Sequence, residues 1–165
     1  MGRRGCRLVP PQLPRRGRAR LVLPSRLFLV ARHGHGGINQ GSKYPSTLRD
    51  KDGDLLDGSK SYKLHLPAGI PAKLYWAVTI YNPADGMMPE TDQPFPSRNT
   101  FDKVQQGTDG SIDLYFGPTK PEGVNEKNWI QTLKGRAFLV TIRLEDSGTE
   151  FYDQNWKPDD VVKVK

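Results

Sequence analysis

The stretch KLYWAVTIYN, residues 73–82, decides the fold class because apolar and aromatic side chains occupy both of its faces. One face carries Leu74, Trp76, Val78 and Ile80, and the other carries Tyr75, Ala77, Thr79 and Tyr81. Successive side chains of a strand point to opposite faces, so such a run predicts a strand that is covered on both sides. We therefore expect residues 73–82 to form a central strand of a sheet.

Three further stretches alternate and predict half-buried strands. They are SYKLHL (61–66), SIDLYFG (111–117) and AFLVTIRLE (137–145). The side chains expected to face the core are Tyr62, Leu64, Leu66, Ile112, Leu114, Phe116, Phe138, Val140, Ile142 and Leu144. Arg143 falls on the opposite face of its strand, and VVKVK (161–165) predicts a final strand. Helical signals are poor, and the one candidate is a short turn around TFDKVQQ (100–106).

Asp-Gly pairs separate these stretches, in DKDGDLLDG (50–58), NPADG (82–86) and TDG (108–110). Asp-Gly favours the tight turns that reverse a strand. Several short strands divided by such turns favour an antiparallel sandwich or barrel over alternating strand–helix units. The sequence therefore predicts one all-β domain, which we place at residues 43–165.

Charge divides the chain into two parts. The chain holds 25 Lys and Arg residues and 18 Asp and Glu residues. Eleven of the basic residues precede Asp50, and none of the acidic residues does. That leaves 14 basic and 18 acidic residues from Asp50 onward, so this part of the domain carries about −4 although the whole chain carries +7. The net charge therefore does not predict a polyanion partner for the body.

Residues 1–42 form a basic leader, rich in Arg and Pro, that fits no standard class of segment fully. A secretory signal needs an unbroken apolar run, but LVLPSRLFLVA (21–31) is interrupted by Pro24 and Arg26. An organelle transit peptide is Arg-rich and acid-poor, as here, but also Ser-rich, which this segment is not. A nucleic-acid-binding arm would have aromatic residues among its arginines and a recognition module after it, but this segment has no aromatic residue before Phe28 and no such module follows. We expect a leader that is disordered or not native to the domain, such as the product of a misplaced start or a frame error, and do not favour a nucleic-acid partner.

Cysteine usage and apolar runs narrow the remaining function classes. Cys6, the only cysteine, lies in the leader, so the body has no disulfide, no Cys metal ligand and no thiol nucleophile. No run of eighteen apolar residues occurs, so no membrane span is expected. Gly-rich phosphate loops are absent as well, and we expect no cofactor.

The acidic stretch DKDGDLLDG places Asp50, Asp52 and Asp54 at alternate positions, as calcium-binding loops do. An EF-hand loop that began at Asp50 would need Gly at its sixth position and Glu at its twelfth. This chain has Leu55 and Ser61 there. The stretch therefore predicts a tight turn and no metal site.

His65 is the only histidine of the body, since His33 and His35 lie in the leader. A metal site with several histidines is therefore excluded there. A Ser-His-Asp triad would have to use His65, but no Gly-x-Ser-x-Gly elbow occurs. We favour an exposed strand position for His65, with a catalytic role as the alternative.

Aromatic residues offer a different kind of site. An aromatic platform for a sugar ring or an extended ligand could use Trp129, Trp156, Tyr81 and Tyr115, with polar contacts from Asp109, Asn128 and Arg143. The alternative is that Trp76, Trp129 and Trp156 are large core or rim residues of a small sandwich. Paired carboxylates such as Asp109 and Asp113 are not singled out by their spacing.

The order of several motifs resembles the bacterial family called domain of unknown function 1214, over residues 43–165. These motifs are KYPSTLRDKDGDLLDGSKSYKLHLPAGIPAKLYWAVTIYNPADG, DGSIDLYFGP, NWIQTLKGRAFLVTIRL and WKPDDVVKV. The resemblance implies a jelly-roll-like β-sandwich that forms the C-terminal half of longer, often exported proteins behind a companion domain of unknown function 1254. It also implies a periplasmic or secreted location. The family often has Leu-Pro after the NW pair and Leu-Tyr at the end of the last long strand, where this chain reads NWIQTL and RLED.

The resemblance also names candidate residues for a pocket or a domain interface. They are Asp109, Gly110, Asn128, Trp129, Arg143 and Trp156. We expect an uncharacterised β-sandwich module, a fragment of a larger exported or envelope protein, that acts in ligand binding or domain assembly. A small molecule or carbohydrate is the expected ligand. The alternative is a hydrolase-like enzyme with a pocket on the sandwich or at the interface with the missing domain, for which His65, Asp109 and Arg143 are the residues to test first.

Overall fold

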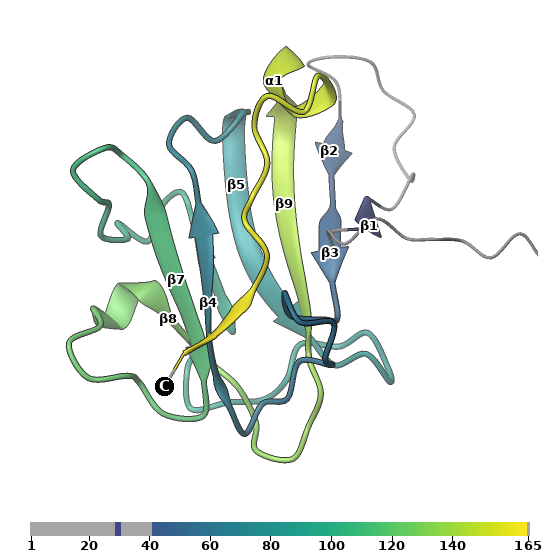
Figure 1. The fold of residues 1–165 in the computed structure, drawn as a ribbon, viewed down its shortest axis with the longest axis vertical. Coiled ribbons are helices and arrows are strands. Elements are labelled where there is room, and N and C mark those ends of the chain that lie inside the picture. Colours follow the sequence, from purple (N-terminus) through teal and green to yellow (C-terminus); the bar gives the residue numbers. More distant parts are fainter. Residues whose placement is uncertain (1–28, 31–40, 165) are drawn as a thin grey trace, which may run out of the picture.

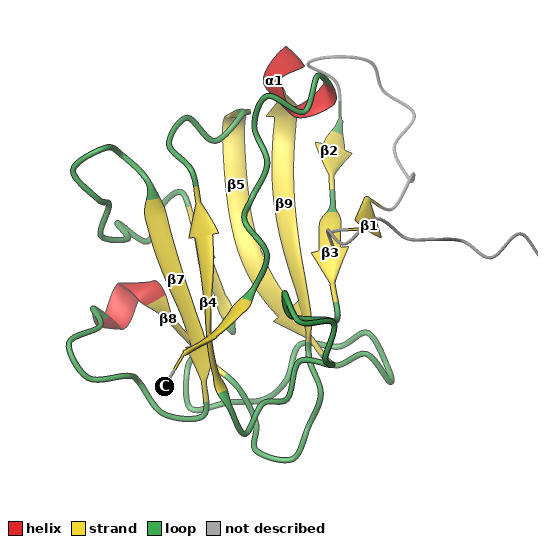
Figure 2. Cartoon of the chain, viewed as in Figure 1, coloured by secondary structure: helices red, strands yellow, loops and turns green. Residues whose placement is uncertain are grey.

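The computed structural model describes residues 29–30 and 41–164, so most of the predicted leader lies outside the described residues. Two β-sheets pack face to face (Figure 1), and strands and loops make up nearly all of the described chain (Figure 2). The elements are β1 (Leu29–Val30), β2 (Ser42–Lys43), β3 (Pro45–Thr47), β4 (Ser61–Leu66), β5 (Ala72–Tyr81), β6 (Ser97–Asn99), β7 (Ile112–Gly117), the 3-10 helix η1 (Glu126–Asn128), β8 (Trp129–Gln131), β9 (Leu139–Ser147), α1 (Thr149–Tyr152) and β10 (Val162–Val164). In this part of the chain no helix has the length and apolar character needed to cross a membrane. The predicted all-β sandwich is confirmed, whereas its jelly-roll connectivity stays a prediction.

The six-stranded sheet has the order β1-β3-β9-β5-β6, and β2 also pairs with β9. β5 pairs antiparallel with β9 on one side and with β6 on the other, which confirms the predicted central strand. Val78 and Ile80 are buried as predicted, but Leu74 is 69 % exposed, so its predicted inward position is wrong. The register between β5 and β9 shifts between Ala72 and Tyr75, and this irregularity takes Leu74 out of the alternation.

The four-stranded sheet has the order β10-β4-β7-β8. The side chains of β4 and β7 that were predicted to face inward are all buried: Tyr62, Leu64, Leu66, Ile112, Leu114 and Phe116. The predicted final strand is also present, as β10. β8 runs parallel to β7, which departs from the antiparallel pattern expected from the sequence. Residues 118–128 return the chain to the same end of the sheet, as a parallel pair requires.

One hydrophobic core fills the space between the sheets. Phe138 precedes β9 and contacts the rings of Tyr62 and Phe116, with ring centroids 5.8 Å apart in each pair. Leu64 of one sheet and Ile142 of the other are fully buried in the same cluster. At about 25 cal/mol per Å² of apolar surface, burial of this kind is the main term that stabilises a chain with no disulfide in its body.

Gly58 is required by a close approach of two backbones. Its N–H donates to the carbonyl oxygen of Arg136 at 2.8 Å, and its own carbonyl accepts from Oγ1 of Thr132 at 2.8 Å. A Cβ at this position would collide with the carbonyl oxygens of Leu133 and Arg136. Gly58 thus hydrogen-bonds the segment before β4 to residues 132–136. A residue with a Cβ at position 58 would prevent this close approach.

The acidic loop after β3 is a tight turn, as predicted. The side chain of Asp50 accepts the hydrogen bonds that hold this turn. Oδ1 of Asp50 accepts hydrogen bonds from the backbone N–H groups of Asp52 and Asp54, each at 3.0 Å. Nζ of Lys163 in β10 lies 3.1, 3.3 and 2.7 Å from carboxylate oxygens of Asp50, Asp52 and Asp54. The 3.1 Å contact with buried Asp50 is an ion pair whose angle does not make a hydrogen bond.

This lysine links the loop to the last strand. The hydrogen bond to Asp54, together with the neighbouring carboxylates of Asp50 and Asp52, raises the pKa of Lys163, and the same lysine lowers the pKa of Asp54. The contribution of ionised Asp54 to the stability of the fold is therefore present above its ordinary pKa, and it is lost as the pH falls through the lowered pKa. Over residues 29–30 and 41–164, no group of three or more His, Cys, Asp or Glu side chains is placed to hold a metal ion.

We expect Asp50→Ala to lower the free energy of unfolding by about 2 kcal/mol, because two hydrogen bonds to a charged acceptor are lost. Urea unfolding followed by circular dichroism measures this change. Asp52→Ala is the matched control, since Asp52 contacts the same lysine but its side chain is 71 % exposed. An exposed ion pair contributes little, so the control should change stability by less than about 0.5 kcal/mol. Equal effects of the two variants would show that the turn does not depend on the buried carboxylate.

Candidate functional site

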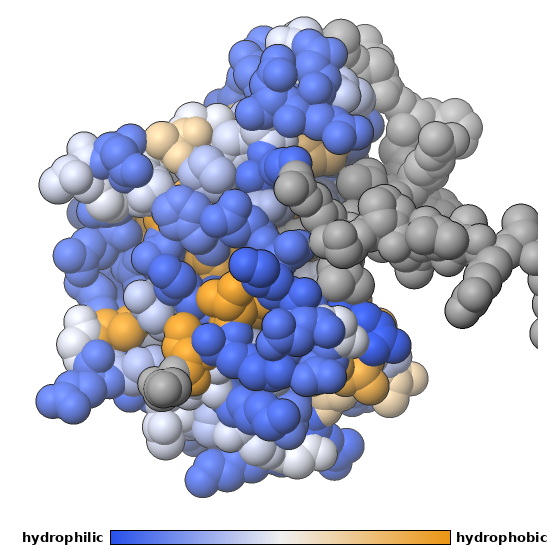
Figure 3. All heavy atoms as spheres, viewed as in Figure 1, coloured by the Kyte–Doolittle hydropathy of each residue, from blue (hydrophilic) through white to orange (hydrophobic). Residues whose placement is uncertain are grey.

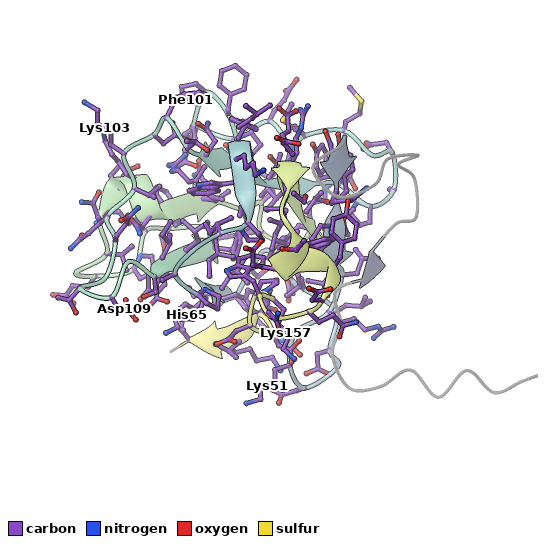
Figure 4. The ribbon with its side chains drawn as sticks, turned by 90° about the horizontal axis from the view of Figure 1, so that it is seen from above. Lys51, His65, Phe101, Lys103, Asp109 and Lys157 are labelled. Carbon is purple, nitrogen blue, oxygen red and sulfur yellow. The ribbon has the colours of Figure 1, made fainter. Side chains whose placement is uncertain are left out.

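The five predicted site residues lie in three places. Asn128 ends η1 and Trp129 begins β8, the edge strand of the four-stranded sheet, and Asp109 lies in the turn before β7. Arg143 lies on the outer face of β9 in the other sheet, and Trp156 belongs to the core cluster. Figure 4 shows His65 and Asp109 on one side of the sandwich and Phe101 on the opposite side. The structure thus gathers three of the five predicted residues around the four-stranded sheet.

Both of the predicted tryptophans use their indole N–H within the fold. Nε1 of Trp156 donates to the carbonyl oxygen of Pro67 at 3.1 Å, and the side chain is 6 % exposed. Nε1 of Trp129 donates to the carbonyl oxygen of Gly117 at 3.1 Å, while the ring stays partly exposed. A buried tryptophan normally finds such a partner for its N–H group. Trp156 therefore packs in the core, and Trp129 is the partly exposed member of the pair.

Asn128 ties three backbone segments together. Its Oδ1 accepts from the backbone N–H of Gln105 at 2.7 Å. Its Nδ2 donates to the carbonyl oxygens of Gln105 at 2.9 Å and Asp113 at 2.8 Å. Asn128 is only 5 % exposed, so its amide is largely shielded from water. The side chain fixes the loop before β7 against η1.

Asp109 shapes the turn that precedes β7. Its Oδ1 accepts from the Oγ–H of Ser111 at 2.6 Å and from the N–H of the same residue at 3.0 Å. The hydrogen bond from the Ser111 hydroxyl, followed by that from its backbone N–H, lowers the pKa of Asp109. Gly110 follows with φ +82°, a conformation that glycine adopts without strain. The carboxylate is exposed and ionised, which suits a turn cap and a polar rim.

Arg143 lies among aromatic rings on the outer face of the six-stranded sheet. Its guanidinium carbon is 5.9 Å from the ring centroid of Tyr44 and 5.8 Å from that of Tyr75. It forms an ion pair with Glu145 two positions along the same strand. The ring of Phe101 lies 5.9 Å from that of Tyr75. We call Tyr44, Tyr75, Phe101, Arg143 and Glu145 the Arg143 surface.

Phe101 is exposed yet firmly positioned. Its side chain is 76 % exposed, and its backbone N–H donates to Oδ1 of Asn99 at 2.8 Å. Oδ2 of Asp102 accepts from the N–H of Asn99 at 2.7 Å, and Thr100 bonds the backbone of Trp76. The helical turn predicted around residues 100–106 is therefore wrong, because side chains of Asn99 and Asp102 compete for the backbone groups. The result is a tight turn that holds a phenyl ring in solvent.

A separate hollow lies at one end of the six-stranded sheet. Its volume is about 430 Å³, and its walls come from residues 80–90 and 133–138. Tyr81, one of the predicted platform aromatics, lines this hollow together with Met87 and Arg136. Tyr115 lines a different hollow on the other sheet. The four predicted platform aromatics therefore do not form one platform, although Trp129 stands in register with Tyr115.

Comparison with models of known protein families shows to which family the chain belongs. A family model described as "Protein of unknown function (DUF1214)" matches residues 41–148, which is more than half of the chain. The chain belongs to this family. A search among curated proteins finds no match to this DUF1214 chain.

Two solved structures are similar to the DUF1214 domain. The VPA0106 protein from Vibrio parahaemolyticus has a TM-score of 0.64 at 20 % identity, over 76 % of this chain and 31 % of that one. An uncharacterised protein from Burkholderia cenocepacia has a TM-score of 0.57 at 17 % identity, over 83 % of this chain and 35 % of that one. At these identities the similarity shows the fold alone. The DUF1214 chain spans about a third of the length of both proteins.

Several residues of interest were missed from the sequence. Tyr44 lies beside the predicted Arg143, Phe101 contacts the ring of Tyr75, and Asp113 of β7 pairs with His65 of β4. The Asn-Thr-Phe-Asp run at 99–102 was the available signal for Phe101, since Asn and Asp around an apolar residue favour a turn over a helix. The neighbours of Arg143 depend on the strand order, which no local pattern contains.

Proposed function

We propose that this DUF1214 domain is an assembly module of a larger exported or envelope protein, and that its Arg143 surface binds a neighbouring domain. The observation that carries the proposal is Phe101, a phenyl ring that is 76 % exposed on a turn fixed by side-chain hydrogen bonds. A ring held in place loses little conformational entropy when a partner buries it. Aromatic residues and arginine are also the residue types that contribute most of the binding energy at protein interfaces.

The charge and length of the chain support a protein partner. Arg143 is already paired with Glu145, so the surface has no net charge that calls for an ionic ligand. The guanidinium carbon of Arg143 also lies over the rings of Tyr44 and Tyr75, 5.9 and 5.8 Å from their centroids. The similar Vibrio and Burkholderia proteins are about three times longer than the region they share with this chain. The partner we propose is the companion domain of unknown function 1254, with an apolar groove for Phe101.

We expect the isolated chain to self-associate reversibly through the Arg143 surface, because no partner covers it. Phe101→Ser should weaken this association about tenfold or more, as removal of a central aromatic anchor does. Analytical ultracentrifugation over a concentration series measures the association constant.

Phe95→Ser is the matched control. Phe95 is 68 % exposed, and it lies before β6 whereas Phe101 lies after it. If both variants weaken self-association equally, general hydrophobicity is responsible and the Arg143 surface is not. A wild-type chain that remains a monomer at every concentration would count against the proposal. Superposition on the Vibrio and Burkholderia structures is an independent check, since the residues equivalent to Tyr75 and Arg143 should be covered by the rest of those chains.

A further inference from the structure

A second hollow lies on the outer face of the four-stranded sheet, on the opposite side of the sandwich from the Arg143 surface. Its volume is about 240 Å³, and its floor and walls include Gln105, Ser111, Asp113, Tyr115, Asn125 and Asn128. We call these residues the Asp113 hollow. The face that carries β4, β7 and β10 is largely hydrophilic (Figure 3), so the hollow sits in a polar surface.

Asp113 is the charged group of the hollow and is held from two sides. Its Oδ1 lies 2.6 Å from Nδ1 of His65, which stands opposite it in the β4–β7 register. Its Oδ2 accepts from Nζ of Lys63 at 3.3 Å. All three side chains are about one-third exposed, so they remain accessible to a ligand. Lys63 balances the charge of the carboxylate, and the hollow has no excess charge for an ionic ligand.

Tyr115 provides an aromatic wall next to this carboxylate. It follows Asp113 by two positions on β7, so the two side chains lie on the same face of the sheet. Trp129 of β8 stands in register with Tyr115. The side-chain amide of Asn128 hydrogen-bonds to the backbone, so this residue shapes the hollow. Asn125 and Gln105 add further side-chain amides to the wall of the hollow.

We propose that the Asp113 hollow binds one ring of a neutral, polyhydroxylated ligand, that is, a sugar. A balanced carboxylate accepts hydrogen bonds from hydroxyl groups, and side-chain amides both donate and accept them. The Tyr115 ring offers an apolar wall for the C–H face of the sugar ring. Pockets for drug-sized ligands measure about 300–1,000 Å³, so the smaller volume of this hollow suits a single ring. This site is independent of the Arg143 surface and of the function proposed for it.

The test is a nuclear magnetic resonance titration of the whole chain with D-glucose, D-galactose and N-acetylglucosamine. We expect at least one sugar to give saturable shifts at the backbone amides of residues 105–115 and 123–129, with a dissociation constant in the millimolar range. Tyr115→Ala should weaken binding about tenfold. Tyr115→Phe keeps the ring and should bind like the wild type, and Asp113→Asn should bind more weakly than the wild type.

Tyr81→Ala is the control variant, because Tyr81 lines the hollow of the other sheet. It should leave sugar binding unchanged. Sodium phosphate is the control ligand and should give no saturable shifts in the Asp113 hollow. The proposal is overturned by the absence of saturation with all three sugars at about 100 mM, which corresponds to binding weaker than about 1.4 kcal/mol. Shifts centred on another surface, or saturation by phosphate, also overturn it. If Tyr115→Ala does not fold, the Asp113→Asn result decides.

Discussion

Trp156→Ala is expected to lower the free energy of unfolding by about 3–5 kcal/mol, the range for truncation of a buried tryptophan. The side chain is 6 % exposed and belongs to the core that both sheets share. Its removal leaves a cavity and deprives the Pro67 carbonyl oxygen of the indole N–H. Domains of this kind are stable by about 5–15 kcal/mol, so the loss is a large share of the total. Urea unfolding followed by circular dichroism measures it.

Trp156→Phe separates packing from hydrogen bonding at this position. The phenyl ring keeps most of the buried volume, so the expected loss is about 1–2 kcal/mol, mainly from the unpaired carbonyl oxygen. The comparison distinguishes the two roles that the sequence left open for this residue. A tryptophan that served as a surface platform for a ligand could be replaced by alanine at a cost below about 0.5 kcal/mol. Such a result would remove Trp156 from the core and return it to the candidate ligand-binding residues.

The buried faces of the strands could be predicted because they depend on local alternation. Leu64 and Leu114 face the core as their positions in the sequence require. Leu74 does not, because a register shift between β5 and β9 is set by the pairing of segments about 70 residues apart. The wrong helical turn near Phe101 has a similar origin, since hydrogen bonds from Asn99 and Asp102 decide that turn.

The candidate sites depend even more on strand order. His65 and Asp113 are 48 residues apart in the chain and meet only because β4 pairs with β7 in one register. Arg143 was correctly assigned to the outer face of its strand, but the tyrosines beside it come from segments that precede β9 by many residues. An amphipathic strand pattern tells which face a residue occupies, and it contains no information about which strand lies next to it.

Asn128→Ala is expected to lower the free energy of unfolding by about 2–4 kcal/mol, because three hydrogen bonds between a buried amide and the backbone are lost. The N–H of Gln105 and the carbonyl oxygens of Gln105 and Asp113 all bond to this one side chain. The same variant should loosen the loop before β7, and hydrogen exchange at residues 103–107 should become faster. Urea unfolding and hydrogen exchange measure the two effects on one sample.

The neighbouring Asn125 provides the matched control for this prediction. It is exposed, and its Oδ1 accepts one hydrogen bond from the N–H of Lys127 as the cap of η1. Asn125→Ala should therefore cost only about 0.5–1 kcal/mol, as the loss of an exposed cap does. If Asn128→Ala is no worse than this control, water reaches the backbone groups around Asn128. The Asp113 hollow would then be wider than its walls indicate, and Asn128 would be available to a ligand after all.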